Sequence, residues 1–392
     1  MKIAIVIEQI EPWRGGAETS TMELARLLQQ RGHEIHLVTA TLAPSPPGQT
    51  IHRIPTGAVL RPSRTLTFVR RADAFLREHP FDVVHAITPM PHADVYQPRG
   101  GLLGETMERN VATRSTATRR AMKRALMAMN FKRRSLLELE REIFRDGGPM
   151  IAAVSNYVAR QCEISYDVGP PRVRVVFNGV SPAPVTEPER AAARSDVRRQ
   201  YHVDDDTLLL LFIAHNFRLK GLFPLIETLS RLVMAGCTAL RLLVVGRDNP
   251  ARYQRRVDAL GLGRFVTFTG PTQRAASFYH AADVCVHPTY YDPCSRVVLE
   301  ALWHGLPCIT TSFNGAAEVV RDGVEGFVVD SPEDTGLWAR RIEELRSPEL
   351  CRKMSRNALR LRERISMDRH VQELDELLAE AADRKRTLAP RG

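Results

Sequence analysis

Several features are scarce in this sequence of 392 residues. It has only six cysteines and no Cys-x-x-Cys pair, which disfavours a zinc site or a disulfide framework and favours core thiols in a reducing compartment. The longest apolar run, 208–214, is far shorter than the roughly 20 residues of a membrane-spanning helix. The apolar stretch at 3–7 is also too short for a signal peptide. These absences predict a soluble, cytoplasmic protein.

The overall composition is that of an ordinary globular protein. Hydrophobic residues make up 44% of the chain and charged residues 26%, which excludes a disordered or low-complexity class. At roughly 100–200 residues per domain, the length suggests two domains. The formal net charge is +10, and a basic surface attracts polyanions such as nucleic acids, anionic lipids or phosphorylated substrates. The charge alone does not choose among these partners.

Short apolar runs alternate with helical patterns along two stretches of the chain. Ile3–Ile7 is typical of a strand buried on both faces, and a loop, a helix over Thr21–Arg31 and a strand over Ile35–Thr39 follow it. A second series begins with a strand at Leu208–Ala214. This alternation predicts the α/β class, with two Rossmann-like, doubly wound domains that face a cleft.

Changes in composition suggest where these domains begin and end. Prolines, an Arg/Ala run and three consecutive aspartates distinguish 181–206 from its surroundings, which is typical of a connection between domains. We therefore expect an N-terminal domain at 1–180, a linker at 181–206, a C-terminal domain at 207–370, and a C-terminal helix and tail at 371–392 that packs back on the N-terminal domain.

The most informative segment is 287–307, where a strand ends, a loop follows and a helix begins near Ser295. Asp292 lies in the loop and Glu300 lies eight residues later in the helix, a span of at most about 12 Å. That reach suits a nucleotide-sugar whose hexose binds one acid and whose ribose binds the other. The alternative is that Asp292 caps the helix and Glu300 is a surface charge.

Backbone amides and two cations supply further groups for the same ligand. The first amides of this helix lack intrahelical partners and carry the positive end of its dipole, so they can bind sugar and phosphate oxygens. These amides belong to Cys294, Ser295, Arg296 and Val297. Arg218 and Lys220 precede another helix, where the dipole disfavours cations unless an anion binds them. They can neutralise a leaving diphosphate, or they are solvated cations.

These segments resemble glycosyltransferase family 4, whose members are retaining enzymes with the GT-B fold. The spacing of Asp292 and Glu300, followed by Ala-x-x-x-Gly-x-Pro, resembles the E-x7-E signature, with Asp in place of the usual first Glu. Similar segments occur in order along nearly the whole chain: Gly15-Gly16-Ala17-Glu18, Phe217-Arg218-Leu219-Lys220-Gly221, Val244-Val245-Gly246, Phe268-Thr269-Gly270 and Ala281-Ala282-Asp283-Val284. The segments Asp94-Val95-Tyr96 and 246–250 are similar to family members that glucosylate the lipopolysaccharide core.

The resemblance implies a retaining hexosyltransferase that acts on a lipid-linked saccharide such as lipopolysaccharide core. It favours glucose as the sugar and UDP as the nucleotide, although Asp at position 292 leaves the sugar in doubt. Asp292, Lys220 and Arg218 would be catalytic, and Glu300 would bind the ribose. Gly15, Gly16 and Gly246 would also contact the donor. The fold implies no catalytic metal and no other cofactor.

The N-terminal domain offers fewer candidate site residues. His85 ends a predicted strand, and the carboxyl ends of parallel strands face the cleft, so it can contact substrate or be satisfied within the fold. Family members usually carry a His or Asp on the next strand, near the anomeric carbon, whereas the matching stretch here offers Gln97 or Arg99. We therefore expect cleft contacts from His85, Gln97 and Arg99.

A basic segment stands out in the N-terminal half. From Arg109 to Leu137 there are nine Lys or Arg and no Asp or Glu. Met122, Leu126 and Met129 fall at helical spacing, which predicts an amphipathic helix that lies on an anionic bilayer. The basic residues that would face the membrane are Arg119, Arg120, Lys123, Arg124, Arg133 and Arg134.

The same segment has two other interpretations. In one, its methionines and leucine pack on the domain core. In the other it binds nucleic acid, which we do not expect because it lacks interleaved aromatics and any recognised motif. The membrane interpretation places the protein at the inner face of the cytoplasmic membrane, where a lipid-linked acceptor would be found.

Two alternatives to a glycosyltransferase remain open. A nucleotide-sugar epimerase or a phosphorylase could share this fold, but the first needs an extra pair of carboxylates and the second a pyridoxal lysine, and neither signature is found. A non-catalytic membrane-binding protein would leave Asp292, Glu300 and Lys220 unexplained.

Overall fold

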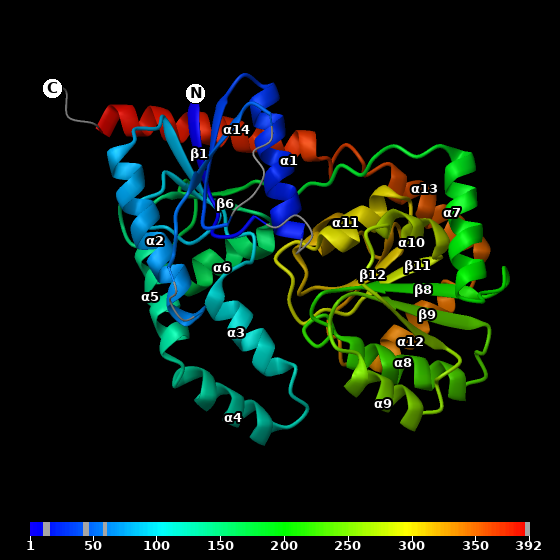
Figure 1. The fold of residues 1–392 in the computed structure, drawn as a ribbon. Coiled ribbons are helices and arrows are strands. Elements are labelled where there is room, and N and C mark those ends of the chain that lie inside the picture. The colour runs from blue at the N-terminus through cyan, green and yellow to red at the C-terminus, as the bar shows by residue number, and fades with distance from the viewer. Residues whose placement is uncertain (11–15, 42–46, 58–60, 389–392) are drawn as a thin grey trace. The chain divides into compact units, whose positions relative to one another are not determined.

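The computed structural model describes residues 1–10, 16–41, 47–57 and 61–388, and the chain divides into two units (Figure 1). Unit 1 comprises Met1–Asn178 and Met367–Gly392, and unit 2 comprises Gly179–Ser366. Each unit is built around one sheet whose paired strands, within the described residues, all run parallel. The predicted α/β class is therefore confirmed.

The sheet of unit 1 has seven strands in the order β3-β2-β1-β4-β5-β6-β7. The strands are β1 (Lys2–Val6), β2 (Glu34–Thr39), β3 (Gln49–Arg53), β4 (Val83–Ala86), β5 (Val95–Tyr96), β6 (Met150–Ala153) and β7 (Val173–Val175). The helices are α1 (Gly16–Gln30), α2 (Arg61–Glu78), α3 (Leu103–Ala112), α4 (Ala117–Ala128), α5 (Phe131–Ile143), α6 (Asn156–Tyr166) and α14 (Met367–Leu388). The apolar run predicted as the first strand is buried in the core, as Ile3 and Ile5 show.

The sheet of unit 2 has six strands in the order β10-β9-β8-β11-β12-β13. The strands are β8 (Leu208–Ile213), β9 (Leu240–Val245), β10 (Val266–Gly270), β11 (Val284–His287), β12 (Cys308–Thr311) and β13 (Gly326–Val329). The helices are α7 (Glu187–Gln200), α8 (Leu222–Met234), α9 (Ala251–Ala259), α10 (Ala275–Ala281), α11 (Arg296–Trp303), α12 (Thr335–Glu344) and α13 (Pro348–Leu359), and η1 (Gly315–Val319) is a 3-10 turn.

Both sheets share one topological feature that positions a site. In each sheet the first strand in sequence lies in the interior. The next two strands lie on one side of it, and the remaining strands lie on its other side. The order therefore reverses between β1 and β4 in unit 1 and between β8 and β11 in unit 2. Ligands of doubly wound sheets bind outside the carboxyl ends of the strands at such a reversal.

The segment expected to be a linker, 181–206, instead contains α7 and belongs to unit 2. The Thr186 side chain caps the helix by accepting a hydrogen bond from the amide of Glu189. In return, the Glu189 carboxylate accepts a hydrogen bond from the amide of Thr186. Pro188 lies in the first turn, where a missing N–H costs nothing, so it starts the helix rather than breaking it. The first boundary falls after Asn178 rather than at 180, and the second after Ser366 rather than at 370.

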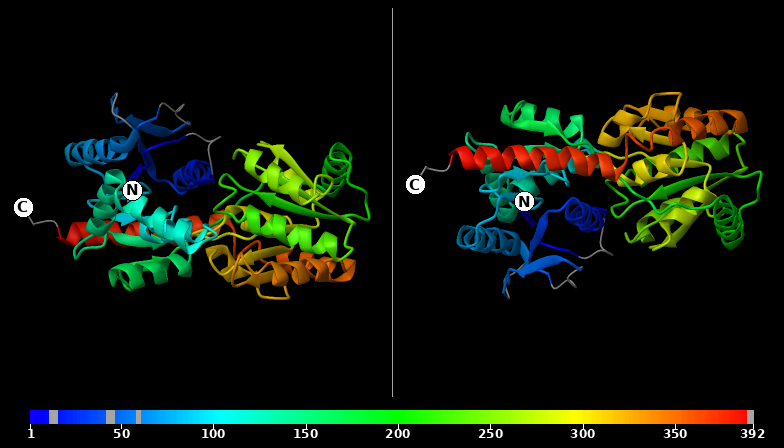
Figure 2. Two further views of the ribbon diagram at one scale, coloured as in Figure 1. Left: turned by 90° about the horizontal axis from the view of Figure 1, so that it is seen from below. Right: turned by 90° about the horizontal axis from the view of Figure 1, so that it is seen from above.

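The C-terminal helix α14 belongs to unit 1 (Figure 2). It packs on α1 and on strands β4, β5 and β6, and its apolar residues Val371, Leu374 and Leu378 are wholly buried in the core of that unit. The helix starts at Met367, four residues before the start expected for the C-terminal segment at 371.

The basic segment 109–137 is not one helix but the end of α3, all of α4 and the beginning of α5. Thr116 and Asn130 cap the two later helices through their side chains, and these caps interrupt the helical pattern. The three helices contact one another. The buried carboxylate of Glu140 on α5 accepts a hydrogen bond from the Leu103 amide at 2.7 Å. This bond joins α5 to the start of α3.

Candidate active site

Two loops meet at the carboxyl ends of β8 and β11, where the strand order of unit 2 reverses. The loop after β8 carries Lys220, and the loop after β11 carries Asp292. The amide of Tyr290 donates to the carbonyl oxygen of Leu219 at 2.9 Å, and the Thr289 hydroxyl donates to the same oxygen at 3.3 Å. The two loops are therefore joined through their backbones.

Lys220 and Asp292 form a partly buried ion pair. Lys220 Nζ donates to Asp292 Oδ2 at 2.6 Å and to the carbonyl oxygen of Tyr291 at 2.9 Å. The two side chains are 18% and 14% exposed, so both remain accessible from solvent. Burial alone would raise the pKa of Asp292, but the Lys220 charge and the contact with His287 outweigh burial and lower it well below its usual value. The carboxyl group is therefore ionised and can accept hydrogen bonds from a ligand.

The start of α11 is fixed by a buried asparagine. Asn314, which follows β12, accepts the amide of Ser295 at 3.1 Å and that of Ala316 at 3.0 Å through its Oδ1. Ser295 Oγ in turn accepts the amide of Val298 at 3.4 Å. The amides of four residues were expected to bind ligand oxygens. One of them, the Ser295 amide, donates its hydrogen bond to Asn314 instead. Cys294 is buried, and Arg296 and Val297 form the first turn of α11.

Glu300 lies on α11 and is held by two neighbours. Tyr279 donates its hydroxyl to Glu300 Oε2 at 3.1 Å, and a guanidinium nitrogen of Arg296 lies 3.4 Å from Oε1. Burial and the adjacent Glu300 carboxylate raise the pKa of Tyr279 well above its ordinary value, so this hydroxyl stays a donor. The Glu300 side chain is 25% exposed, which leaves its carboxylate accessible to a ligand.

Arg218 and Gly246 lie in the neighbouring loops. The Arg218 guanidinium carbon lies 5.6 Å from the centre of the Phe223 ring, a cation–π distance. Gly246 has a φ of +151°, and a Cβ there would lie 1.8 Å from the carbonyl oxygen of Ala214, so the contact of the β8 and β9 loops requires glycine. Asp248, two residues after Gly246, accepts a hydrogen bond from the amide of Phe217 at 2.8 Å.

The three candidate residues of unit 1 come together at the ends of β4 and β5. Arg99 Nε donates to Gln97 Oε1 at 2.8 Å, and its Nη1 donates to the hydroxyls of Ser20 at 2.7 Å and Thr21 at 3.0 Å on α1. His85 and Gln97 are wholly buried. Arg99 is thus fixed in position by three side chains.

His85 is a neutral group in this cluster. Burial lowers the pKa of His85 to about 3, and the charges of Arg99 and His370 act in the same direction. Gln97 is near enough to oppose the shift, but within the described residues neither ring nitrogen of His85 has a hydrogen bond of normal geometry. The ring therefore offers one donor and one acceptor at the carboxyl edge of the sheet.

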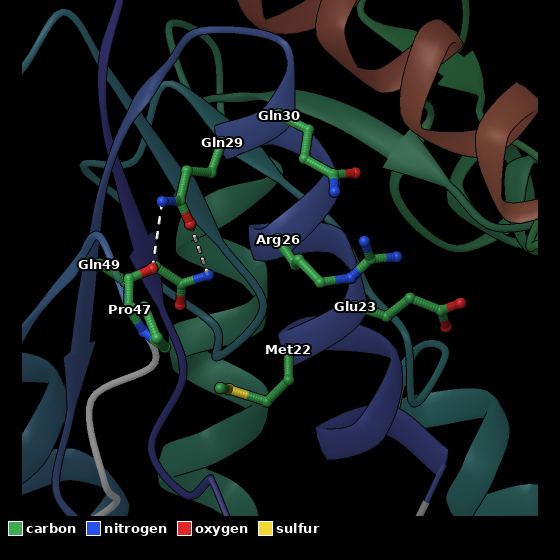
Figure 3. Close-up of a pocket in the computed structure, with 7 residues that line it drawn as sticks. All are labelled: Met22, Glu23, Arg26, Gln29, Gln30, Pro47 and Gln49. Atoms are coloured by element: carbon green, nitrogen blue, oxygen red, sulfur yellow. Dashed lines mark hydrogen bonds between the residues drawn. The ribbon is translucent and has the colours of Figure 1, made fainter.

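The glycine pair expected near the donor is only partly described. Gly16 is the first residue of α1, and Gly15 lies outside the described residues, as does Trp13 beside it. A hollow of about 610 Å³ opens along the same helix (Figure 3). It contains none of the candidate site residues. Its lining is Met22, Glu23, Arg26, Gln29, Gln30, Pro47 and Gln49.

The basic segment presents apolar side chains to solvent. Met122, Leu126, Met129 and Phe131 are 60%, 59%, 81% and 80% exposed, so the interpretation in which Met122, Leu126 and Met129 pack on the core is wrong. On α4, Met127 is buried. The helices α4 and α5 carry the basic residues named above, Arg119, Arg120, Lys123, Arg124, Arg133 and Arg134. We call these four apolar and six basic residues the α4–α5 surface. Within the described ranges, no helix is long and apolar enough to cross a membrane.

Four residues of these sites escaped the sequence interpretation: Asn314, Tyr279, Ser20 and Thr21. Asn314 had a usable signal, since it follows the strand β12 at the carboxyl edge of the sheet. The other three lie within helices and gave no signal. Within the described residues, no group of three or more His, Cys, Asp or Glu is placed to hold a metal ion.

Comparison with known protein families assigns both halves of the chain. The family model "Glycosyltransferase Family 4" matches residues 14–183, and the model "Glycosyl transferases group 1" matches residues 193–361. Among curated relatives, the lipopolysaccharide glucosyltransferase WaaG of Escherichia coli (strain K12) is 24% identical over 334 residues, which cover 85% of this chain and 86% of that protein. The D-inositol 3-phosphate glycosyltransferase of Mycobacterium sp. (strain KMS) is 26% identical over 85% of this chain and 78% of its own length.

Solved structures show the same architecture. The crystal structure of WaaG superposes with a TM-score of 0.80 at 22% identity and covers 96% of this chain and 99% of that one. Anabaena Alr3699/HepE in complex with UDP-glucose matches with a TM-score of 0.71 at 18% identity over 97% of this chain and all of that chain. At such identities the likeness shows the fold, and the expected GT-B fold is confirmed. The family resemblance found in the sequence is confirmed as well.

Proposed function

Since the chain belongs to the family 4 and group 1 glycosyltransferases, we propose that it transfers a hexose from a nucleotide-sugar to a lipid-linked saccharide, with retention of configuration. Glucose and UDP are the favoured sugar and nucleotide. The observation that carries the proposal is the Lys220–Asp292 pair at the strand reversal of unit 2, because it places a cation for phosphate beside an anion for sugar hydroxyls.

Each ligand group has a matching protein group in this proposal. Asp292 accepts hydrogen bonds from the hexose, and Glu300, oriented by Tyr279, accepts the ribose hydroxyls. Lys220 and Arg218 stabilise the charge that develops on the leaving diphosphate, together with the amides of Arg296 and Val297 in the first turn of α11. Charge stabilisation by these groups lets the reaction proceed without a metal ion, so activity should survive excess chelator. Attack on the face that the diphosphate leaves gives retention.

UDP and glucose are favoured by relatives and not by a contact in this chain. Anabaena Alr3699/HepE has been solved with UDP and glucose and with UDP-glucose, and WaaG is named a lipopolysaccharide glucosyltransferase. We extend the same donor to this chain because the fold is shared. In unit 1, Arg99 is partly exposed and would contact the acceptor, whereas His85 and Gln97 are wholly buried.

The α4–α5 surface supports the proposed acceptor and location. Exposed apolar side chains surrounded by cations can insert into an anionic bilayer while the cations attract its headgroups. We propose that the protein works at the inner face of the cytoplasmic membrane, where this surface brings unit 1 to a lipid-linked acceptor. A lipopolysaccharide core acceptor agrees with the name of WaaG.

Thermal stabilisation by nucleotides tests the donor assignment first. A ligand that binds only the native state stabilises it by RT ln(1 + [L]/Kd), about 2.7 kcal/mol at a hundredfold excess over Kd. We expect UDP and UDP-glucose to raise the Tm more than GDP, ADP or their glucose conjugates. Lys220→Ala and Glu300→Ala should abolish the shift, whereas Glu227→Ala, which removes an exposed partner of Arg256, should keep it.

Product analysis then tests the reaction. UDP-glucose and a lipopolysaccharide core acceptor should give an α-linked product, because the α-configuration of the donor is retained. A β-linked product would contradict retention. A folded protein whose Tm no nucleotide changes would contradict the donor site.

A further inference from the structure

His287 is the last residue of β11, and it lies next to Asp292 of the Lys220–Asp292 pair. Its side chain is 1% exposed, and its Nε2 lies 3.5 Å from Asp292 Oδ2 and 3.4 Å from Ser295 Oγ. The Phe212 ring stacks against the imidazole at a centroid distance of 6.4 Å. Within the described residues, Nδ1 has no hydrogen-bond partner. All the polar contacts of the ring are thus made by one nitrogen.

These contacts decide the protonation of the ring. Burial lowers the pKa of His287, the Asp292 contact opposes the shift, and the Lys220 charge adds to it, so the ring is neutral near pH 7. A neutral imidazole carries one N–H. Because the carboxylate of Asp292 can only accept, the proton belongs on Nε2, and Nδ1 is the unprotonated nitrogen.

The distance from Nε2 to Asp292 Oδ2 is long for a hydrogen bond. Contacts of this kind are often long in the free enzyme and shorten when substrate binds. Asp292 Oδ2 already accepts from Lys220 Nζ, so the same oxygen is placed between an ammonium group and an imidazole N–H. Its loop is anchored too, since the amide of Asp292 donates to Phe313 and its carbonyl oxygen accepts from Gly315, both at 2.9 Å.

We propose that His287 is a positioning residue of the transfer reaction, which orients the Asp292 carboxylate and through it the Lys220 ammonium group. This inference rests on the proposed function, in which Lys220 meets the donor diphosphate. The donor then replaces Asp292 as a partner of Lys220, while His287 keeps the carboxylate in place for the sugar. The imidazole touches neither the donor nor the acceptor.

The kinetic consequence falls on kcat. Charge on the diphosphate is largest in the transition state, so a displaced Lys220 loses more stabilisation there than in the ground state. We expect His287→Leu, which keeps apolar contact with Phe212 but has no N–H, to lower kcat by about tenfold or more, with a much smaller change in the KM for the donor. His287→Gln, whose amide nitrogen reaches nearly as far as Nε2, should restore most of kcat.

A matched control separates positioning from packing. His280 on α10 is also buried, and within the described residues its ring nitrogens have no hydrogen bond either. His280→Leu should change kcat little at a similar cost in Tm. A His287→Gln enzyme as slow as His287→Leu, or a His280→Leu enzyme as slow as both, would overturn the proposal.

Chemical labelling of Lys220 gives a readout that needs no substrate. A trace of an amine-specific acylating reagent, followed by peptide mass spectrometry, should modify Lys220 severalfold faster in His287→Leu than in wild type, because the Asp292 carboxylate no longer holds the amine. His287→Gln should react like wild type. Unchanged labelling in His287→Leu would overturn the inference. If UDP fails to bind the wild-type protein while labelling still follows this pattern, the donor assignment has failed and the positioning of Lys220 stands.

Discussion

Gly221 and Pro288 approach so closely that a Cβ atom on Gly221 would lie 1.8 Å from the carbonyl oxygen of Pro288. Gly221 follows Lys220, and Pro288 follows the strand that ends at His287, so this contact joins the two loops of the candidate site. The φ of Gly221 is +81°, in the left-handed region. Glycine is therefore needed here for two independent reasons, the backbone conformation and the space.

Gly221→Ala should disrupt unit 2 and its ligand site together. A non-glycine residue in the left-handed region costs about 1 kcal/mol, and forcing the Pro288 loop away adds roughly 1–3 kcal/mol. We expect a total loss of at least about 2 kcal/mol in the free energy of unfolding, measured by urea denaturation, with loss of UDP binding. The control is Gly236→Ala, where φ is +88° and no atom lies within 4 Å of the added Cβ. Equal losses in the two variants would contradict the steric argument.

The position of α7 within unit 2 rests on a buried charge. Arg198 is 3% exposed and donates to Asp283 Oδ2 at 2.6 Å, while Arg194 donates to Oδ1 at 2.9 Å. Asp283 also accepts the amide of Leu209 at the start of β8. One carboxylate thus joins the helix, the loop before β11 and the central strand.

Asp283→Ala should therefore destabilise unit 2 strongly. Removing one partner of a buried ion pair leaves an uncompensated charge, here that of Arg198, and costs about 3–5 kcal/mol. The matched control is Asp196→Ala on the same helix, which removes an exposed pair with Arg199 and should cost under about 1 kcal/mol. Chemical denaturation measures both. If the two variants were equally stable, α7 would be only loosely attached, as a linker would be.

Sequence patterns identified the candidate site because its main residues follow strands. Lys220 comes after the longest apolar run and Asp292 after the short strand β11, and the doubly wound order brings the ends of those two strands together. Periodicity therefore located both residues, and the ion pair between them, 72 positions apart in sequence, followed only from the fold. Tyr279 acts on this site through one side-chain contact made from within a helix, which no spacing rule detects, whereas Asn314 could have been found from its place after β12.

Other elements were missed for identifiable physical reasons. β5 has only two residues and β7 three, too short for any alternation to show. The prolines of 181–206 are typical of a linker, but Pro188 occupies the first helical turn of α7, where proline is favoured. The basic segment has one continuous apolar pattern, but the caps at Thr116 and Asn130 divide it into separate helices. Strand length, the backbone of proline and side-chain caps thus decided these three features.

The neutral His85 should make unit 1 sensitive to acid. Its pKa is about 3 in the folded protein and 6.5 in the unfolded chain, so between these values the unfolded state binds one more proton. The free energy of unfolding therefore falls as the pH is lowered from 6.5 towards 3, by about 1.4 kcal/mol per pH unit for this group. Its full contribution is present above pH 6.5.

Substitution of His85 isolates its share of this pH dependence. His85→Leu and His85→Gln both remove the titrating group, so each should reduce the slope of unfolding free energy against pH by nearly one proton. The measurement is urea denaturation at several pH values between about 4 and 6.5. The two variants differ in polarity, so a slope that changes in only one of them would point to packing rather than protonation.

Membrane binding should depend jointly on the apolar and basic parts of the α4–α5 surface. Met129 and Phe131 are 81% and 80% exposed at the junction of the two helices, and exposed cations such as Arg119 and Arg134 lie nearby in the chain. Each basic residue near an anionic bilayer contributes about 1 kcal/mol, so Arg119→Gln with Arg134→Gln should weaken binding about 30-fold at low salt. High salt should remove most of that difference.

The apolar contribution should behave differently with salt. Met129→Ser with Phe131→Ser removes side chains that would enter the bilayer, and their burial does not depend on ionic strength. We expect this variant to bind phosphatidylglycerol vesicles weakly at every salt concentration in a co-sedimentation assay. Met234→Ser, which removes a side chain that is 85% exposed on α8, serves as the control and should bind like wild type. Binding lost equally in the control would show that any exposed apolar residue suffices, and binding kept in both α4–α5 variants would place the membrane contact elsewhere on the protein.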